Sequence, residues 1–190
     1  MTVTAQSDEE LIERYGRGDA AAFETLYRRH EMRIWRYLQR YVNNRATADE
    51  LMQEVWFAVA RDAQRYEPSA RFTTWLYTIA HNRMIDSVRK SRRQTSLEAI
   101  GYEAEPVVHQ LTADPCAGPF AAAVARDQAG GLARALEKLP AEQREAFLLQ
   151  TEGDLGVEEI AAITDSSFET TKSRLRYART KLRELLKEYA

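Results

Sequence analysis

The chain has 190 residues, a net charge of -2, 44% apolar residues and 29% charged residues, which is typical of an ordinary globular protein with one or two domains. A single cysteine excludes an intrachain disulfide, and no apolar run approaches the roughly 20 residues of a membrane span. The polar, acidic N-terminus is unlike a signal peptide. We therefore expect a cytoplasmic protein without membrane insertion. Eight glycines and five prolines favour helices over many-turned β-structure, so we expect an all-α fold.

Four helices are predicted in residues 1–93, which we take as a first domain. Ser7 and Glu10 have the spacing of a capping box and open a short helix. Asp19 can cap the next helix, which has roughly 22 residues. Thr47 and Glu50 form a second candidate capping box, ahead of a helix over 48–62. The fourth helix covers residues 72–93.

The helix over 72–93 has two different faces. One is an apolar stripe of Leu76, Tyr77, Ala80, Met84 and Val88. The other combines an aromatic ring, an amide and cations, which suits single-stranded nucleic acid because cations track phosphates and a ring stacks on unpaired bases. The alternative is a solvated basic helix end with Trp75 in the core. The candidate residues, called the basic face below, are Trp75, Asn82, Arg83, Asp86, Arg89, Lys90, Arg92 and Arg93.

The helix over 48–62 buries one apolar side and carries acids beside large aromatics on two neighbouring helical lines. Exposed aromatics next to acids favour a protein-binding surface. The alternative is that the two aromatic residues complete a small core between three helices. This surface, called the acidic ridge below, comprises Asp49, Glu50, Gln53, Glu54, Trp56 and Phe57.

Residues 94–119 are predicted to be a linker. They contain three prolines, two glycines and no helical periodicity. Four acids and no Lys or Arg give this segment a charge of -4. We therefore expect a flexible acidic connection between two domains.

Residues 120–190 are predicted to form a second domain of four helices. The first covers 120–138, and the second begins at Pro140 and ends just before Gly153. A short helix over 157–163 is followed by a turn, and Ser166 with Glu169 forms a third candidate capping box for the last helix. The apolar stripe of the last helix is Phe168, Thr171, Leu175, Ala178, Leu182, Leu185 and Tyr189. A short helix, a tight turn and a basic helix together indicate a helix-turn-helix.

Opposite its apolar stripe, the last helix carries short polar residues flanked by cations. Such polar residues near a helix N-terminus reach base edges while the cations hold phosphates. The alternative is a solvated basic helix. The candidates, called the recognition face below, are Glu169, Thr170, Lys172, Ser173, Arg174, Arg176 and Tyr177.

No catalytic constellation is apparent in the sequence. His30, His81 and His109 lie on different elements, and His109 and Cys116 have no further ligand candidates nearby. There is no glycine-rich phosphate loop and no hydrolase motif. We therefore expect no enzymatic activity, no cofactor and no metal site.

Taken together, the segments resemble the sigma-70 family of bacterial RNA polymerase specificity subunits, in particular the small two-domain extracytoplasmic-function class. FETLYRRHEMRIWRYLQRY and ATADELMQEVWFAV look like the first two conserved segments of that family. RFTTWLYTIAHNRMIDSVRKSRR looks like its segment for promoter melting and minus-ten reading. LPAEQREAF, EEIA and TKSRLRYAR, in this order, look like its minus-thirty-five domain.

The resemblance implies roles for the three surfaces. The acidic ridge would bind core RNA polymerase, the basic face would melt and read the minus-ten element, and the recognition face would read the minus-thirty-five element of promoter DNA. It also implies an anti-sigma factor as inhibitory partner, and a linker that threads through the polymerase. The chain departs from the family at Glu169, Thr170 and Thr171, where a Gly-Thr-Val-like run is usual, and at Tyr177, where a basic residue is common.

Three other functions remain open at this stage. The first is a stand-alone helix-turn-helix regulator that acts without polymerase. The second is a metal-dependent hydrolase or nuclease that uses Asp49, Glu50 and Glu54, although this ligand set is incomplete. The third is a sigma mimic that only titrates an anti-sigma factor.

Overall fold

The computed structural model describes residues 6–42, 44–68, 70–97 and 130–187, with side chains for all of these except 91–97. Every regular element in these ranges is a helix, which confirms the expected all-α fold. Among the described residues, no helix is long and apolar enough to cross a membrane.

The first unit contains four α-helices and a short 3-10 helix. Ser7 caps the first of them through its hydroxyl, which accepts from the Glu10 amide at 3.1 Å while the Glu10 carboxylate accepts from the Ser7 amide, so the predicted capping box is confirmed. Asp19 Oδ1 accepts from the amide of Ala21 at 3.1 Å and opens the second helix, as predicted. The elements are α1 (Asp8–Gly16), α2 (Ala20–Val42), α3 (Arg45–Asp62), η1 (Ala63–Arg65) and α4 (Phe72–Leu97).

Two boundaries in this unit differ from the prediction. The capping box of Thr47 and Glu50 is wrong, because α3 begins at Arg45 and its cap is Asn44, whose side chain accepts from the Thr47 amide at 3.0 Å. α4 continues to Leu97, four residues into the predicted linker. The rest of the linker, with its predicted flexibility and acidic charge, lies outside the described residues.

The second unit begins with a helix over 130–137, so the part of its predicted first helix before residue 130 lies outside the described residues. The helices that follow are α6 (Ala141–Gly153), α7 (Val157–Ile163) and α8 (Phe168–Lys187). Pro140 is the cap of α6 rather than its first residue. Gly153 is the last residue of α6, and Asp154 takes the left-handed conformation beyond it with φ of 53°.

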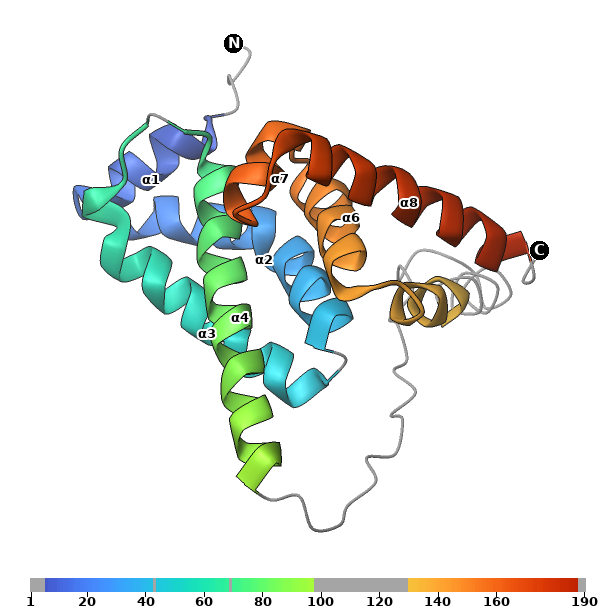
Figure 1. Ribbon diagram of the computed structural model, residues 1–190. Coiled ribbons are helices and arrows are strands. Elements are labelled where there is room, and N and C mark those ends of the chain that lie inside the picture. The colour runs from blue at the N-terminus through green and yellow to red at the C-terminus, as the bar shows by residue number, and fades with distance from the viewer. Residues whose placement is uncertain (1–5, 43, 69, 98–129, 188–190) are drawn as a thin grey trace, which may run out of the picture.

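One continuous apolar core runs through both units. It joins residues of the first unit, such as Leu38 and Met84, to residues of the second, such as Leu148 and Leu182. In Figure 1, α6 and α7 lie against α2 and α4, and α8 crosses the outer side of α6 and α7. The two units therefore pack directly on each other, and this packing decides which faces of α2 and α4 remain open.

Candidate nucleic-acid interface

The acidic ridge lies on α3, and most of it faces outward. Asp49, Glu50, Gln53 and Glu54 are exposed, and the Phe57 side chain is 74% exposed. The Trp35 indole on α2 donates to Asp49 Oδ1 at 2.7 Å, and Glu50 and Glu54 form no ion pair with any residue that the structure describes. Glu50 and Glu54 therefore have free carboxylates to offer a partner.

Trp56 is buried, although the acidic ridge was expected to expose it. Its side chain is only 6% exposed. The centre of its ring lies 5.6 Å from that of Phe23, which it meets edge-on, and 5.0 Å from that of Tyr27, which it meets at a tilt. The core alternative therefore holds for Trp56, and the exposed alternative holds for Phe57. The reason is that α3 turns the Trp56 side toward α2, so the two neighbouring residues point in different directions.

Two shallow cavities flank the acidic ridge. One of about 330 Å³ lies between Phe23, Tyr27, Trp56 and Phe57 and is mostly apolar. The other, of about 580 Å³, reaches from Met32 to Asp49, and Met32 is itself 54% exposed. Acids beside apolar hollows offer both charge and contact area to a protein partner.

The basic face of α4 is partly exposed to solvent. Asn82, Asp86, Arg89 and Lys90 are exposed, and Arg83 is half-buried. Arg89 and Lys90 form no ion pair within the described residues, so both are available to phosphates. The side chains of Arg92 and Arg93 lie outside the described residues.

Trp75 is half-buried rather than free. Its ring lies 5.2 Å from that of Tyr66 and 5.9 Å from that of Phe72. The Tyr66 hydroxyl donates to the Ala70 carbonyl at 2.8 Å, and burial together with the nearby Glu9, Glu13 and Asp8 raises the pKa of Tyr66 to about 12. Tyr66 therefore stays neutral and fixes one edge of the Trp75 ring. Trp75 belongs partly to the core and partly to the surface beside Asn82.

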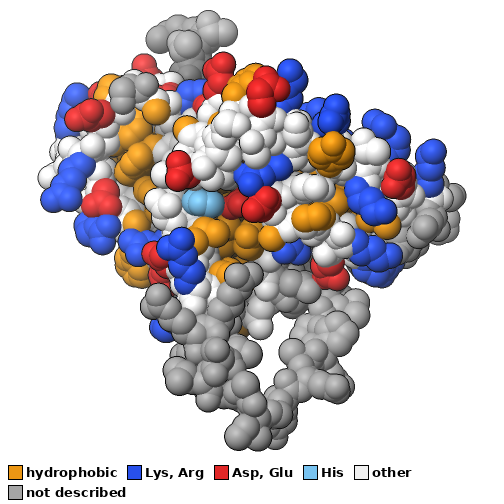
Figure 2. Space-filling view, viewed as in Figure 1, with side chains coloured by type: hydrophobic (Ala, Val, Ile, Leu, Met, Phe, Trp, Pro, Cys, Tyr) orange, Lys and Arg blue, Asp and Glu red, His pale blue; other side chains and the backbone are white. Residues whose placement is uncertain are grey.

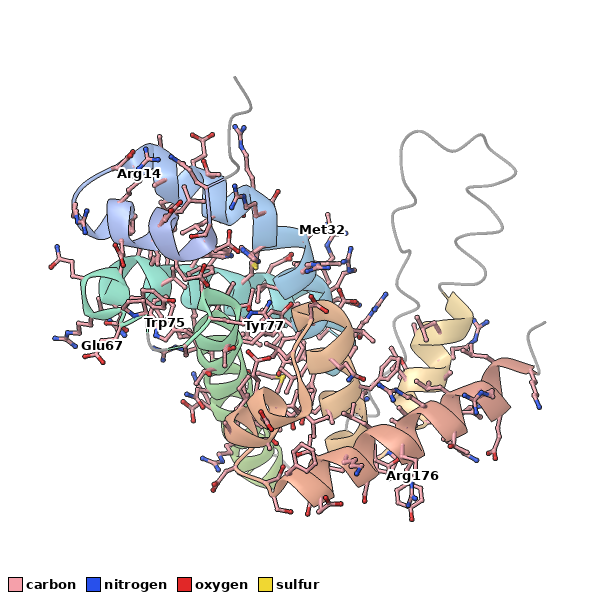
Figure 3. All side chains as sticks on the ribbon, turned by 90° about the horizontal axis from the view of Figure 1, so that it is seen from above. Arg14, Met32, Glu67, Trp75, Tyr77 and Arg176 are labelled. Carbon is pink, nitrogen blue, oxygen red and sulfur yellow. The ribbon has the colours of Figure 1, made fainter. Side chains whose placement is uncertain are left out.

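The recognition face lies on α8, the second helix of the predicted helix-turn-helix. α7 has the predicted bounds, and Asp165 makes the turn between α7 and α8 in the left-handed conformation, with φ of 47°. Figure 2 shows Lys and Arg side chains gathered along α8, and Figure 3 shows Arg176 pointing away from the body of the molecule. On α8, Glu169, Thr170, Lys172, Arg176 and Tyr177 are exposed, whereas Ser173 and Arg174 are half-buried.

The third predicted capping box is wrong by one residue. Ser167, and not Ser166, caps α8, because the Ser167 hydroxyl accepts from the Thr170 amide at 3.1 Å. The Ser166 hydroxyl instead shares a 2.7 Å hydrogen bond with that of Thr171. No described residue holds the Glu169 carboxylate, so Glu169 stands in the first turn of α8 without a capping role.

Phe168 is a surface residue that sequence reasoning placed in the apolar stripe. Its side chain is 43% exposed, and the Lys172 ammonium lies 5.8 Å from the centre of its ring. The Arg176 guanidinium covers the Tyr177 ring in the same way, at 4.9 Å. Recognising Ser167 instead of Ser166 as the cap would have revealed the exposure of Phe168. With the cap at Ser167, Phe168 is the first residue of α8, and a residue at that position lies at the edge of the apolar stripe.

Arg174 is tied within the second unit. Its guanidinium donates to Glu142 on α6 at 2.8 Å.

Among the described residues, no group of three or more His, Cys, Asp or Glu side chains could hold a metal ion. This finding covers the acidic trio of Asp49, Glu50 and Glu54 on α3.

Two family models match the chain. Sigma-70 region 2 matches residues 26–94, which carry the acidic ridge and the basic face, and sigma-70 region 4 matches residues 130–182, which carry the helix-turn-helix. The chain is 35% identical to the RNA polymerase sigma factor CarQ of Myxococcus xanthus, over 93% of this chain and 96% of that protein. It is 30% identical to the ECF RNA polymerase sigma-E factor of Escherichia coli, over 91% of each chain.

These matches define a two-domain transcription factor, and the chain belongs to the sigma-70 family of RNA polymerase sigma factors, within its extracytoplasmic-function class. Solved structures agree at the level of the fold. The sigma factor RpoE of Bartonella quintana, crystallised with the anti-sigma factor NepR, has a TM-score of 0.71 at 24% identity, over 87% of this chain and 96% of RpoE. CnrH in complex with the cytosolic domain of CnrY has a TM-score of 0.68 at 22% identity, over 97% of this chain and all of CnrH.

Proposed function

We propose that this protein is a promoter-specificity subunit that binds core RNA polymerase, directs it to specific promoters and promotes strand opening. The observation that supports the proposal is that a chain of this family carries two separate exposed basic helix faces, on α4 and α8, and an exposed acidic ridge beside apolar hollows on α3. A stand-alone regulator needs only the recognition face. It has no use for a second basic helix with an exposed amide or for an acidic ridge flanked by apolar hollows.

Each surface has a distinct task in this proposal. The acidic ridge binds polymerase through Glu50, Glu54 and Phe57, which are the exposed acids and ring. The basic face captures the unpaired non-template strand at the minus-ten element, with Asn82 and Trp75 facing bases and Arg89 facing phosphate. Capture of flipped bases offsets unstacking and unpairing, at about a few kcal/mol per base, so strand separation follows from binding without a bond-making step.

The recognition face reads the minus-thirty-five element. Glu169 is free to accept from the exocyclic amine of a cytosine, and Phe168 beside it can contact a thymine methyl group. The cations of α8 hold phosphates and set the position of the helix on DNA. Because the family's usual Gly-Thr-Val-like run is replaced here, we expect an unusual minus-thirty-five preference.

An anti-sigma factor is proposed as the inhibitory partner. A sigma factor of the same fold, RpoE of Bartonella quintana, has been solved in complex with the anti-sigma factor NepR. The acidic ridge and the faces on α4 and α8 are the surfaces that such an inhibitor would have to cover.

The test is reconstitution with core RNA polymerase. The purified chain should copurify with core enzyme and should support transcription from a defined set of promoters, found by sequencing transcript starts after overexpression. Aligned start sites should share two elements at minus ten and minus thirty-five. Promoter binding without any association with core polymerase would favour the stand-alone regulator instead.

A further inference from the structure

Two adjacent acids at the start of α1 hold the first residue of α4 in place. Glu9 Oε1 accepts a hydrogen bond from the backbone amide of Phe72 at 2.9 Å, across 63 residues of chain. Asp8 Oδ2 lies 2.6 Å from His30 Nε2 on α2, and the centre of the His30 ring lies 5.4 Å from that of Phe72. α1 therefore fixes the backbone of Phe72 directly and its side chain through His30.

The Phe72 amide belongs to the group of donors that every α-helix leaves without an intrahelical partner. A carboxylate at this end of a helix supplies the missing acceptor, and its negative charge is favourable beside the positive end of the helix dipole. The first turn of α4 contains no acidic residue of its own. Glu9 supplies both the acceptor and the charge from α1, whose ribbon lies beside the start of α4 in Figure 1.

Phe72 is also the buried member of a cluster of three aromatic rings. Its side chain is fully buried, and its ring centre lies 5.9 Å from that of Trp75 and 6.2 Å from that of Tyr66. The ring centres of Tyr66 and Trp75 are 5.2 Å apart, and Trp75 is only half-buried. Movement of Phe72 therefore shifts the ring that the basic face presents to solvent.

The connection that leads into α4 is closed by contacts to the same cluster. The Tyr66 hydroxyl donates to the Ala70 carbonyl at 2.8 Å. The Trp75 amide donates to the Arg71 carbonyl at 3.2 Å. Both contacts depend on where α4 begins, because Ala70 and Arg71 directly precede Phe72. The first turn of α4 and this connection are therefore joined as one piece.

Glu9 lies outside the part of the chain that matches sigma-70 region 2. That match covers residues 26–94, whereas α1 covers Asp8–Gly16. Leu11 and Ile12 of α1 are buried in the core, which gives this helix a structural role. The hydrogen bond between Glu9 and Phe72 adds a contact with the helix that carries the basic face. α1 is therefore connected to the proposed strand-opening surface, although the matched region does not include it.

We propose that Glu9 is a positioning residue for promoter opening, because it fixes the first turn of α4 and so the direction in which Trp75 meets the unpaired strand. The inference rests on the proposed function, in which Trp75 and Asn82 face bases of the minus-ten element. Asn82 lies ten residues beyond Phe72, about 15 Å along α4, so its position does not depend on the first turn. Loss of Glu9 therefore affects Trp75 and leaves Asn82 in place.

Hydrogen exchange of the Phe72 amide in the full free chain, followed by NMR, tests the contact without polymerase or DNA. Glu9→Ala removes the acceptor and should speed this exchange by about tenfold or more. Glu9→Gln keeps an acceptor oxygen in the same place and should stay within about threefold of wild type. The matched control is Glu10→Ala, which removes the carboxylate that accepts from the Ser7 amide but leaves Phe72 untouched. Rapid exchange of the Phe72 amide in the wild-type chain would overturn the proposal.

Promoter opening by polymerase reconstituted with the full chain tests the consequence. Glu9→Ala should slow open-complex formation about tenfold. Its affinity for core polymerase should stay at the wild-type value, because the acidic ridge on α3 is unchanged. Glu9→Gln should open promoters at nearly the wild-type rate, since it keeps the hydrogen bond to the Phe72 amide. Glu10→Ala should also open normally, and equal opening rates for Glu9→Ala and Glu10→Ala would overturn the proposal.

A double-mutant comparison separates the positioning of Trp75 from a general weakening of the fold. Adding Glu9→Ala to Trp75→Ala should cause no further loss of opening, because the ring that Glu9 positions is gone. Adding Glu9→Ala to Asn82→Ala should multiply the two losses, and multiplication in both combinations would overturn the positioning role. A wild-type chain that opens no promoter would overturn the proposed function and this role together. A functional wild type with unaffected opening by Glu9→Ala would overturn only the role of Glu9.

Discussion

The Trp35 indole Nε1 and the Asp49 carboxylate Oδ1 lie 2.7 Å apart, and this hydrogen bond joins α2 to α3 at the edge of the acidic ridge. Asp49 is also 3.8 Å from Arg45 on its own helix. It therefore serves the fold as well as the surface. Glu50 and Glu54 have no such partners among the described residues, so they are the better probes of polymerase binding.

Reversing the charge of Glu50 and Glu54 should weaken core-polymerase binding by about tenfold or more, because two carboxylates facing the partner become repulsive. The thermal midpoint should stay within a few degrees of wild type, since both side chains are exposed. Affinity is measured by fluorescence titration against core enzyme. Glu137→Lys, at an exposed position of the second unit, is the matched control. Wild-type affinity in a folded double variant would remove the acidic ridge from the polymerase interface.

Asn82→Ala should lower open-complex formation more than closed-complex binding, because the exposed amide meets bases only after they unpair. Its stability should change by about 0.5 kcal/mol or less. Trp75→Ala should show the same defect together with a stability loss of roughly 1–3 kcal/mol, because the ring also packs against Tyr66 and Phe72. Permanganate footprinting measures opening. A template with a premelted bubble should restore open-complex formation by the Asn82→Ala variant. If it does not, strand melting depends on other residues.

Glu169→Gln should change which base is preferred at one minus-thirty-five position, with a loss of discrimination of roughly 1–3 kcal/mol. Its thermal midpoint should hardly move, because Ser167 rather than Glu169 interacts with the first turn of α8. Ser167→Ala is the matched comparison, and loss of that cap should cost about 1 kcal/mol of stability. Selection from a pool of promoter variants, beside melts of both proteins, checks this. If Glu169→Gln leaves the base preference unchanged, base recognition would be assigned to Ser173, Arg176 and Tyr177 instead.

Asp8 should contribute stability that depends on pH. Burial raises its pKa, but hydrogen bonds from His30 at 2.6 Å and Arg29 at 2.7 Å outweigh burial and leave the pKa below its usual range. A carboxyl group with a lowered pKa in the folded state stabilises the fold above its unfolded pKa of about 3.9 and loses that effect as the pH falls through the folded value.

The difference in thermal midpoint between wild type and Asp8→Asn should therefore be largest near neutral pH and should shrink below about pH 4. Thermal melts across this range measure it. A difference that stays constant down to about pH 3 would show that the Asp8 charge does not act as described.

The sequence by itself determined most of the local structure. Apolar spacing located α2, α4 and α8, the capping box of Ser7 and Glu10 located the start of α1, and the predicted bounds of α7 are confirmed. These features depend on residues within one or two turns of each other, which is the range over which helix periodicity and capping act. The same range explains why the three candidate surfaces could be recognised, since each lies on a single helix.

The tertiary structure decided what each surface residue faces. Trp56 and Phe57 are neighbours with similar side chains, and only the position of α2 buries the first and exposes the second. A shift of one residue in the cap of α8 brought Phe168 to the surface and released Glu169. The pairing of Glu152 with Arg36 and Arg40 spans more than a hundred residues of chain. No local pattern encodes such a contact, because it exists only when two separately folded helical units bury their charges against each other.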